Sequence, residues 1–364
     1  MLRNVCVCAR VGVALAASRA ARWLHSLLVH VVVQMLAAQP SGETTSGENA
    51  TTLFMRASAM LVNEDNAAID GLFESYRCKH VYLDMGTNTG VQIRKLFERK
   101  LYPRARVMTH YKALFGPTPW CRVCAIGFEP NPEHAQRLDQ LQHSLRAAGA
   151  PVHIFRAATS DALATMSFQS QGGEAPWVRS LHLNAGAKAG ASAYEAQTPS
   201  TAVGHVTVRT LDLARIVHRV HSNLRRINGG SRGESRILMK LDIEGGEERL
   251  LFHLARTQTL CLIDRVMVEW HRLDLHMPWL RDTAKLSPTM LRNTSRDQPS
   301  ASGVAAVTNL TYGLRKHLLE VLNAGAADCR TDLMAVDDET FYRDGRPLPT
   351  NQTVPCVRPA VSQS

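Results

Sequence analysis

Acidic residues are absent from the first 42 positions of the 364-residue chain, although the same stretch contains four arginines. A basic, acid-free leader of this kind is typical of a targeting segment. Its apolar part, residues 22–39, is shorter than the roughly 20 apolar residues that a membrane span requires. We therefore expect residues 1–39 to be a signal peptide or a signal anchor that would attach the chain to a membrane. An organelle transit peptide is the alternative.

Aromatic residues are also scarce, at 6% of the chain, and none occurs in the basic stretch 209–236. Single-stranded nucleic acids are held by basic grooves with interleaved aromatic side chains. This composition therefore disfavours a nucleic-acid partner in spite of the net charge of +10. Basic runs are more often solvated helix faces than polyanion sites, and we interpret residues 209–236 in that way.

Cysteine is used in an even number beyond the leader, where six residues can form disulfides in an oxidising compartment. Cys121 and Cys124 form a lone CxxC motif, which lacks the second pair of ligands that a structural zinc site needs. The pairing cannot be deduced from the sequence, and Cys329 with Cys356 is a guess. The six cysteines are Cys78, Cys121, Cys124, Cys261, Cys329 and Cys356.

Four Asn-x-Ser/Thr motifs, at Asn49, Asn293, Asn309 and Asn351, match the N-glycosylation acceptor pattern. Together with the leader and the cysteines they favour the secretory pathway, in the lumen or membrane of the endoplasmic reticulum or Golgi. The Arg-rich, acid-poor leader keeps a mitochondrion or plastid open as the alternative.

Apolar runs rich in Val, Ile, Leu and Met alternate with helical patterns between residues 78 and 275. The runs lack strict apolar–polar alternation, which is typical of strands buried on both faces of a sheet. We therefore predict an α/β fold with a mostly parallel, doubly wound sheet and helices on both faces. The predicted strands are 80–84, 123–129, 152–157, 237–242 and 263–269, and the predicted helices include 132–147, 247–256 and 311–324.

Stretches rich in Pro, Gly or Ser interrupt this alternation. Residues 40–55 are expected to be a flexible linker or stem, and residues 350–364 a tail. The folded domain then spans 56–349, with its core at 78–275 and a C-terminal helix and extended segment (331–336) within 311–349. Three further stretches, 102–121, 170–204 and 277–308, are predicted to be surface loops or lids.

Neither of the two common phosphate-binding motifs is present. Counting a G-x-G-x-x-G pattern from Gly86 places Asn88 and Val91 where glycines are needed, which disfavours a dinucleotide. No G-x-x-x-x-G-K-[ST] motif occurs, which excludes a P-loop. The turn "DMGTNTG" still resembles a ligand-binding turn, because Gly86 and Gly90 follow a buried strand and allow close approach of a ligand.

Acids at the ends of two predicted strands indicate the ligand. Asp84, at the turn itself, would repel a diphosphate but attract a sulfonium and an amino group. Glu129, which ends the second strand, is placed to accept hydrogen bonds from ribose hydroxyls. Both features predict S-adenosylmethionine as the cofactor.

Five segments, in chain order, resemble the FkbM family of methyltransferases: "LDMGTNTG", "GFEPNPEHAQRL", "VRTLDL", "LMKLDIEGGEERLL" and "VMVEWH". The resemblance covers about residues 78–275 and, more weakly, 311–349. It implies a Rossmann-like class I methyltransferase fold, S-adenosylmethionine as methyl donor and a hydroxyl oxygen as acceptor. The gaps between Gly86 and Glu129, and between Asp161 and "VRTLDL", are longer than the family pattern needs.

The resemblance also assigns roles to individual residues. Asp84, Gly86, Asn88 and Gly90 would cradle the methionine end of the cofactor, and Glu129 would hold the ribose, with Asn131 in the same loop. Asp161 would lie beside the adenine and accept a hydrogen bond from its amino group. A simple helix N-cap is the alternative role for Asp161.

Candidate catalytic groups follow the fourth and fifth predicted strands. Lys240, Asp242 and Glu244 alternate and therefore share one face of the chain. Asp242 is predicted to be the base, or a metal ligand together with Glu244, although we assign no metal ion. His271 is a second proton acceptor, because its ordinary pKa is near 6.5. Lys240 is interpreted as the partner of one of these acids in an internal ion pair.

These features together predict an O-methyltransferase that acts on a hydroxyl of a glycan or small molecule. The motif typical of enzymes that methylate base amines is absent, because the position after the fourth strand is Asp242-Ile-Glu-Gly. A catalytically silent binding module that keeps the fold is the main alternative. The oligomeric state is not predicted.

Overall fold

The computed structural model describes most of the chain between residues 50 and 356. The described residues are 50–170, 182–184, 204–229, 234–243, 246–270, 329, 331–336, 338, 340–341, 345–354 and 356. Two compact units, 1–67 and 68–364, divide the chain, and the boundary falls within helix α2 (Ala50–Tyr76). That helix begins inside the stretch 40–55 that the sequence predicts to be a linker. The rest of the description concerns the second unit.

A six-stranded sheet forms the centre of this unit, and all of its strand pairs are parallel. The strand order is β10-β9-β8-β1-β2-β3. The chain therefore winds outward from β1 in one direction and later from β8 in the other, so the order reverses between β1 and β8. The α/β class and the parallel sheet are confirmed, and they are compatible with a Rossmann-like fold. The strands are β1 (His80–Met85), β2 (Val123–Phe128), β3 (Val152–Phe155), β8 (Ile237–Leu241), β9 (Arg265–Val268) and β10 (Asp332–Ala335).

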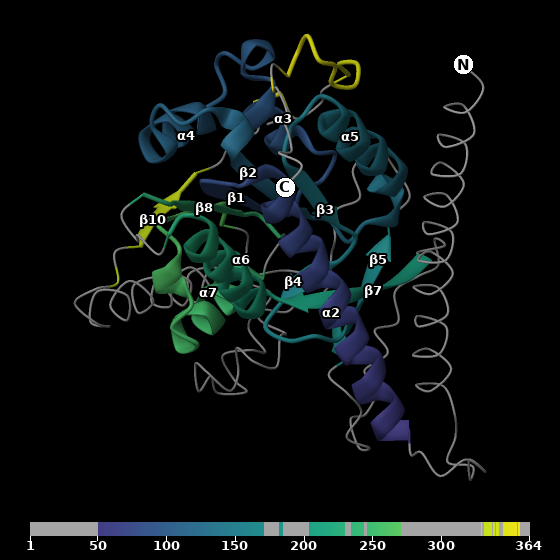
Figure 1. Cartoon of the computed structure of the whole chain (residues 1–364). Coiled ribbons are helices and arrows are strands. Elements are labelled where there is room, and N and C mark those ends of the chain that lie inside the picture. The colour runs from purple at the N-terminus through teal and green to yellow at the C-terminus, as the bar shows by residue number, and fades with distance from the viewer. Residues whose placement is uncertain are drawn as a thin grey trace, which may run out of the picture. The chain divides into compact units, whose positions relative to one another are not determined.

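Helices cover both faces of the sheet, as predicted (Figure 1). Alternate residues of β1 serve the two faces: Val81 and Leu83 enter one core, whereas Tyr82 enters the other. The first core packs against α6 (Leu213–Ile227), α7 (Glu247–Arg256) and the C-terminal part of α2. The second core packs against α3 (Val91–Phe97), α4 (Val107–Phe115) and α5 (Ala135–Ala147). Short 3₁₀ turns lie at η1 (Arg99–Leu101), η2 (Trp120–Arg122), η3 (Pro132–His134) and η4 (Leu260–Leu262).

Four strands form a second sheet, which the sequence did not predict. β7 pairs in parallel with β4 and antiparallel with β5, which in turn pairs with β6. β7 ends at Asp212, whose carboxylate accepts hydrogen bonds from the first amides of α6. The strands are β4 (Ala158–Ser160), β5 (Thr165–Ser170), β6 (His182–Asn184) and β7 (Gly204–Asp212).

The prediction of a loop over 102–121 is wrong, because this stretch contains helix α4. Its apolar residues lie on one helix face, where Val107, Met108, Tyr111 and Phe115 are buried. Aromatic side chains pack on this face, where the Tyr111 ring makes an edge contact with the Tyr82 ring. The predicted extended segment at 331–336 is confirmed, and it forms strand β10. The predicted helix 311–324 and the loop 277–308 lie outside the described residues.

The basic stretch 209–236 contributes mainly to β7 and α6. Two of its arginines face acids of α2: Arg219 pairs with Asp70, and Arg226 lies 3.5 Å from Glu74. The contacts agree with a solvated helix face whose charges are balanced by a neighbouring helix. No helix in the part of the chain that the structure describes is long and apolar enough to cross a membrane. The leader 1–39 is not among those residues.

All six cysteines beyond the leader form disulfides: Cys78–Cys124, Cys121–Cys356 and Cys261–Cys329. The guessed pairing of Cys329 with Cys356 is therefore wrong, because the fold brings each to a different partner. The two cysteines of the CxxC motif also belong to separate bridges. Cys356 and the buried Val354 attach the chain beyond residue 350 to the core, so the fold extends into the predicted tail.

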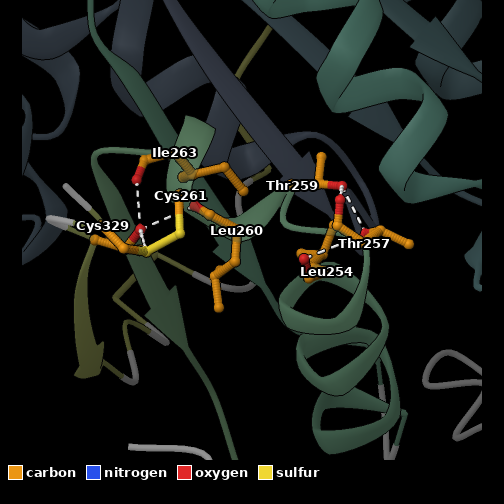
Figure 2. The surroundings of a disulfide bond; sticks show 8 residues. Leu254, Thr257, Thr259, Leu260, Cys261, Ile263 and Cys329 are labelled. Atoms are coloured by element: carbon orange, nitrogen blue, oxygen red, sulfur yellow. Dashed lines mark hydrogen bonds between the residues drawn. A yellow bond between two sulfur atoms is a disulfide. The ribbon is translucent and has the colours of Figure 1, made fainter. Parts of the chain in front are cut away.

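The Cys261–Cys329 bridge joins η4 to the residues that lead into β10 (Figure 2). Next to it, the Thr331 hydroxyl donates hydrogen bonds to the carbonyl oxygens of Leu260 and Ile263, at 2.8 and 2.9 Å. The bridge and these hydrogen bonds fix the start of the edge strand β10 against the loop before β9.

Replacing both Cys261 and Cys329 with alanine is expected to lower the free energy of unfolding by about 4 kcal/mol. The sequence separation is 68 residues, and the chain-entropy model assigns about this stabilisation to a loop of that size. Guanidinium unfolding followed by circular dichroism measures the change. An unfolding curve equal to that of the unmodified chain would contradict the prediction.

Candidate active site

The turn after β1 lies where the strand order of the sheet reverses. Gly86 has a φ of +83°, and a Cβ atom there would lie 1.7 Å from the carbonyl oxygen of Asp242. Asp242 follows β8, and its amide donates a hydrogen bond to the Met85 carbonyl at 3.1 Å. Only glycine satisfies both the backbone conformation and the close approach, so Gly86 allows the ends of β1 and β8 to meet.

Two further residues of the turn have left-handed backbone conformations. Asn88 has a φ of 52°, a conformation that asparagine adopts more readily than most residues. This explains how the turn forms without the second glycine of a dinucleotide motif. Gly90 has a φ of +88°, and a Cβ atom there would lie 2.2 Å from the Leu141 side chain. Gly90 therefore allows α5 to pack directly against the turn.

A cleft of about 370 Å³, including space open to solvent, lies at this turn. Its place at the carboxyl ends of parallel strands is where ligands bind in open α/β sheets. The lining residues come from the turn, from α3, from the end of β8 and from the chain after β10. They are Gly86, Thr87, Asn88, Thr89, Val91, Gln92, Lys95, Lys240, Asp242, Asp338 and Thr340.

Charged side chains gather at and beneath the cleft. Lys240 is buried, forms an ion pair with Asp242 and lies 3.8 Å from a Glu269 carboxylate oxygen. The predicted internal ion pair of Lys240 is thus confirmed. Asp84 is the neighbour of Lys240 in the register of β1 and β8.

A second ion pair completes this group, with Lys95 Nζ 3.3 Å from Asp338 Oδ2. Both side chains are fully buried. The six groups, two lysines and four carboxyls, carry a surplus of two negative charges when all are ionised. This group of six is called the cleft charge cluster below.

Burial changes the ionisation of the cleft charge cluster. It raises the pKa of the Asp84 carboxyl to about 6, although the charge of Lys240 acts in the opposite direction. Asp84 Oδ1 accepts a hydrogen bond from the Tyr82 hydroxyl at 3.0 Å, whereas Oδ2 is buried and has no hydrogen-bond partner among the described residues. Burial favours the neutral form of Lys240, but Asp242 and Asp84 outweigh it and raise its pKa, so Lys240 stays protonated.

Glu129 and Asn131 do not line the cleft. The Glu129 carboxylate accepts hydrogen bonds from the backbone amides of Asn88 and Asn131, at 2.7 and 2.8 Å, and so links the two loops. The Asn131 side chain accepts a hydrogen bond from the Glu133 amide, which caps the next turn. Glu129 is 7% exposed, and burial raises its pKa to about 7. Both residues stand beside the turn, as predicted, but they bind the chain itself.

Asp161 also has an internal partner. It follows β4 and pairs with the guanidinium of Arg249 on α7, with Nη2–Oδ1 at 2.6 Å. Burial opposes ionisation of this carboxyl, but Arg249 outweighs burial and lowers its pKa. Asp161 does not line the cleft. Glu244 and His271, two of the three predicted catalytic residues, lie outside the described residues.

Several lining residues were not predicted from the sequence. Lys95 lies four residues after Val91, which is about one turn of α3, so the two side chains share a helix face. This spacing could have predicted that Lys95 lies near the turn after β1. Asp338 and Thr340 also line the cleft, although they lie more than 240 positions after the turn and α3 in the sequence. Their contacts depend on the path of the chain after β10, for which no local pattern exists.

Comparisons of the chain with protein family models, curated proteins and solved structures found no match. The site is therefore interpreted from its own geometry.

Replacing Gly86 with alanine is expected to lower the free energy of unfolding by at least about 2 kcal/mol, because the Cβ atom would meet the Asp242 carbonyl in a left-handed conformation. Gly71→Ala is the matched control, since a Cβ atom in that helical position meets no atom within 4 Å. The control should be stabilised by up to about 1 kcal/mol. Equal unfolding midpoints for the two variants would contradict the assignment of Gly86.

The raised pKa of Glu129 predicts a pH dependence of stability. Between pH 4.5 and about 7 the folded protein holds a proton that the unfolded chain releases. The free energy of unfolding therefore falls as the pH rises through this window, by about 3 kcal/mol in total. The contribution is fully present below pH 4.5.

The free energy of unfolding of Glu129→Gln should lack this part of the pH dependence, whatever its value at a single pH. The contribution of Asp84 to the pH dependence stays in both proteins. Urea unfolding at several pH values from 4.5 to 8 measures the difference. Parallel curves for the two proteins would show that Glu129 does not titrate in this window.

Proposed function

We propose that the chain is an S-adenosylmethionine-dependent O-methyltransferase of the FkbM type, with a class I methyltransferase fold. The observation that carries the proposal is the cleft at the reversal of the strand order. Two lysines and two aspartates line it, and Asp84 and Glu269, which lie beside Lys240 outside the lining, give the cleft charge cluster its surplus of carboxyl groups. The cofactor has a sulfonium and an ammonium group, and a negative site attracts both. A diphosphate would be repelled by the same carboxylates, which disfavours the dinucleotide alternative.

The residues present fit one end of the cofactor. Gly86 and Asn88 line the cleft in left-handed conformations, and the proposal assigns them to the methionine end of the cofactor. The contacts proposed for the ribose and the adenine, through Glu129 and Asp161, rest on the family resemblance alone. In the structure these two carboxylates bind backbone amides and Arg249.

When bound, S-adenosylmethionine would supply a methyl group on its sulfonium. An acceptor hydroxyl oxygen would displace it in line, with the methyl–sulfur bond broken and S-adenosylhomocysteine as the leaving group. The chain must orient the acceptor, exclude water and remove one proton. Alignment of the reacting groups supplies a large part of such a rate acceleration. Asp242 lines the cleft and is the described residue best placed to take the proton. Lys240 holds this carboxylate in position through its ion pair, while Glu244 and His271 stay predicted contributors.

We propose a hydroxyl of a glycan or small molecule in the secretory pathway as the acceptor. The three disulfides support an oxidising compartment. The cleft charge cluster gives no support to a nucleic acid, because its surplus of carboxylates would repel phosphates. A catalytically silent binding module is the second candidate, favoured by the internal partners of Glu129 and Asp161.

Calorimetric titration of the full chain with S-adenosylmethionine tests the proposal. We expect micromolar affinity, and at least about tenfold weaker binding for Asp242→Asn, because the variant removes one negative charge from the cleft. Asp332→Asn is the matched control. It removes a half-exposed carboxylate at the start of β10, the opposite end of the strand from the cleft, and should bind as the unmodified chain does.

The outcomes separate the two candidates. Binding together with transfer of labelled methyl groups to hydroxyl acceptors supports the enzyme. Binding without transfer to any glycan or small hydroxyl compound favours the silent module. No binding by a folded sample, or equal loss of affinity in both variants, contradicts the proposed site.

A further inference from the structure

A turn at residues 350–354 presents one Asn-x-Thr motif on the surface. Asn351 and Gln352 are exposed at the tip of the turn, whereas Val354 is buried at its base. Backbone hydrogen bonds close the turn, from the amides of Thr353 and Val354 to the Thr350 carbonyl, at 3.0 and 2.9 Å. An acceptor asparagine must reach the transferase, and this turn leaves it accessible in the folded chain.

The hydrogen bonds of the turn do not involve the side-chain amide of Asn351. The remaining hydrogen bonds are made by hydroxyls: the Thr350 amide donates to Thr353 Oγ1 at 3.0 Å, and the Gln352 amide donates to Thr350 Oγ1 at 3.3 Å. A large group attached to Asn351 would therefore point to solvent without breaking the turn. The middle residue of the motif is Gln352, so the motif meets the requirement that this position is not proline.

The disulfides place the turn in the required environment. All six cysteines between 78 and 356 are paired, which is typical of a chain that folds in an oxidising compartment. Cys356, five residues after Asn351, is one of them. The enzymes that attach N-linked glycans act in the lumen of the same pathway.

The turn also lies away from the cleft. The chain runs from Asp338, beside the start of α3, along that helix: Arg94 Nη2 bonds to the Pro347 carbonyl, and Arg346 to the Leu101 carbonyl. It ends at Cys356, which is bonded to Cys121 just before β2 begins. In Figure 1 this yellow segment lies beside α3. The segment therefore carries Asn351 toward the amino ends of the strands, whereas the cleft lies at their carboxyl ends.

We propose that Asn351 carries an N-linked glycan. Its amide nitrogen forms a bond to the anomeric carbon of a lipid-diphosphate-linked oligosaccharide. The bond from that carbon to the phosphate oxygen breaks, the diphosphate leaves with the electron pair, and the amide loses one proton. This inference does not rest on the proposed methyl transfer, and its test is independent of cofactor binding.

The full chain is expressed in a secretory host, together with Asn351→Gln, Thr353→Ala and Thr353→Ser. The released protein is treated with peptide N-glycosidase in ¹⁸O-water, and the peptide that contains residue 351 is analysed by mass spectrometry. We expect conversion of Asn351 to ¹⁸O-labelled aspartate in the unmodified chain and in Thr353→Ser, which keeps the hydroxyl. Asn351→Gln and Thr353→Ala should each lack one glycan in the intact mass.

The proposal is overturned if the peptide carries only unmodified asparagine in folded protein, or if Asn351→Gln has the same intact glycan mass as the unmodified chain. Thr353→Ala removes a hydroxyl that holds the turn, so Asn351→Gln is the variant that separates glycosylation from folding. Circular dichroism confirms that both are folded.

Discussion

The close contact between the ends of β1 and β8 determines how the rest of the site is arranged. The Gly86 backbone lies directly against the Asp242 carbonyl, at a distance that no side chain at position 86 would permit. Because the strand order reverses at this contact, the loops after the two strands diverge and leave a cleft between them and α3. Residues that reach the cleft do so from elements whose positions this contact sets.

Buried charge is the main electrostatic feature of that cleft. Lys240 and Lys95 are removed from water and are compensated by carboxylates, since an unpaired buried charge would cost several kcal/mol. The cleft charge cluster contains four carboxyl groups and two lysines, so its net charge is negative when all six groups are ionised. Asp84 and Asp338 are buried together with the two lysines, whereas Asp242 and Glu269 are partly exposed. Burial raises the pKa of the Asp84 carboxyl to about 6, against the opposing charge of Lys240.

Covalent links hold the C-terminal segment in place. Asp338 and Thr340 line the cleft, and the chain beyond them is fixed by Arg94, by the buried Val354 and by the Cys121–Cys356 bridge. The same segment thus contributes to the cleft at one edge of the sheet and exposes Asn351 near the other. A segment with few regular hydrogen bonds needs such anchors, because its own backbone supplies little stability.

Local patterns in the sequence were sufficient for strands β1, β2, β3, β8 and β9, the helices at 132–147 and 247–256, and the turn around Gly86. Burial of a strand and turn chemistry both depend on neighbouring residues. The same patterns also placed Asp84, Glu129 and Asp242 at strand ends. Helix α4 was missed because Pro103, Pro117 and Pro119, which flank it, and its aromatic residues are typical of a loop. The packing of Tyr111 on Tyr82 is a tertiary contact that the local pattern does not show. Only the tertiary structure decided the disulfide partners, the approach of Asp338 to Lys95, and the internal use of Glu129 and Asp161. Each of these contacts joins residues that are distant in the sequence. The path of the folded chain brings such residues together, and no local spacing encodes that path.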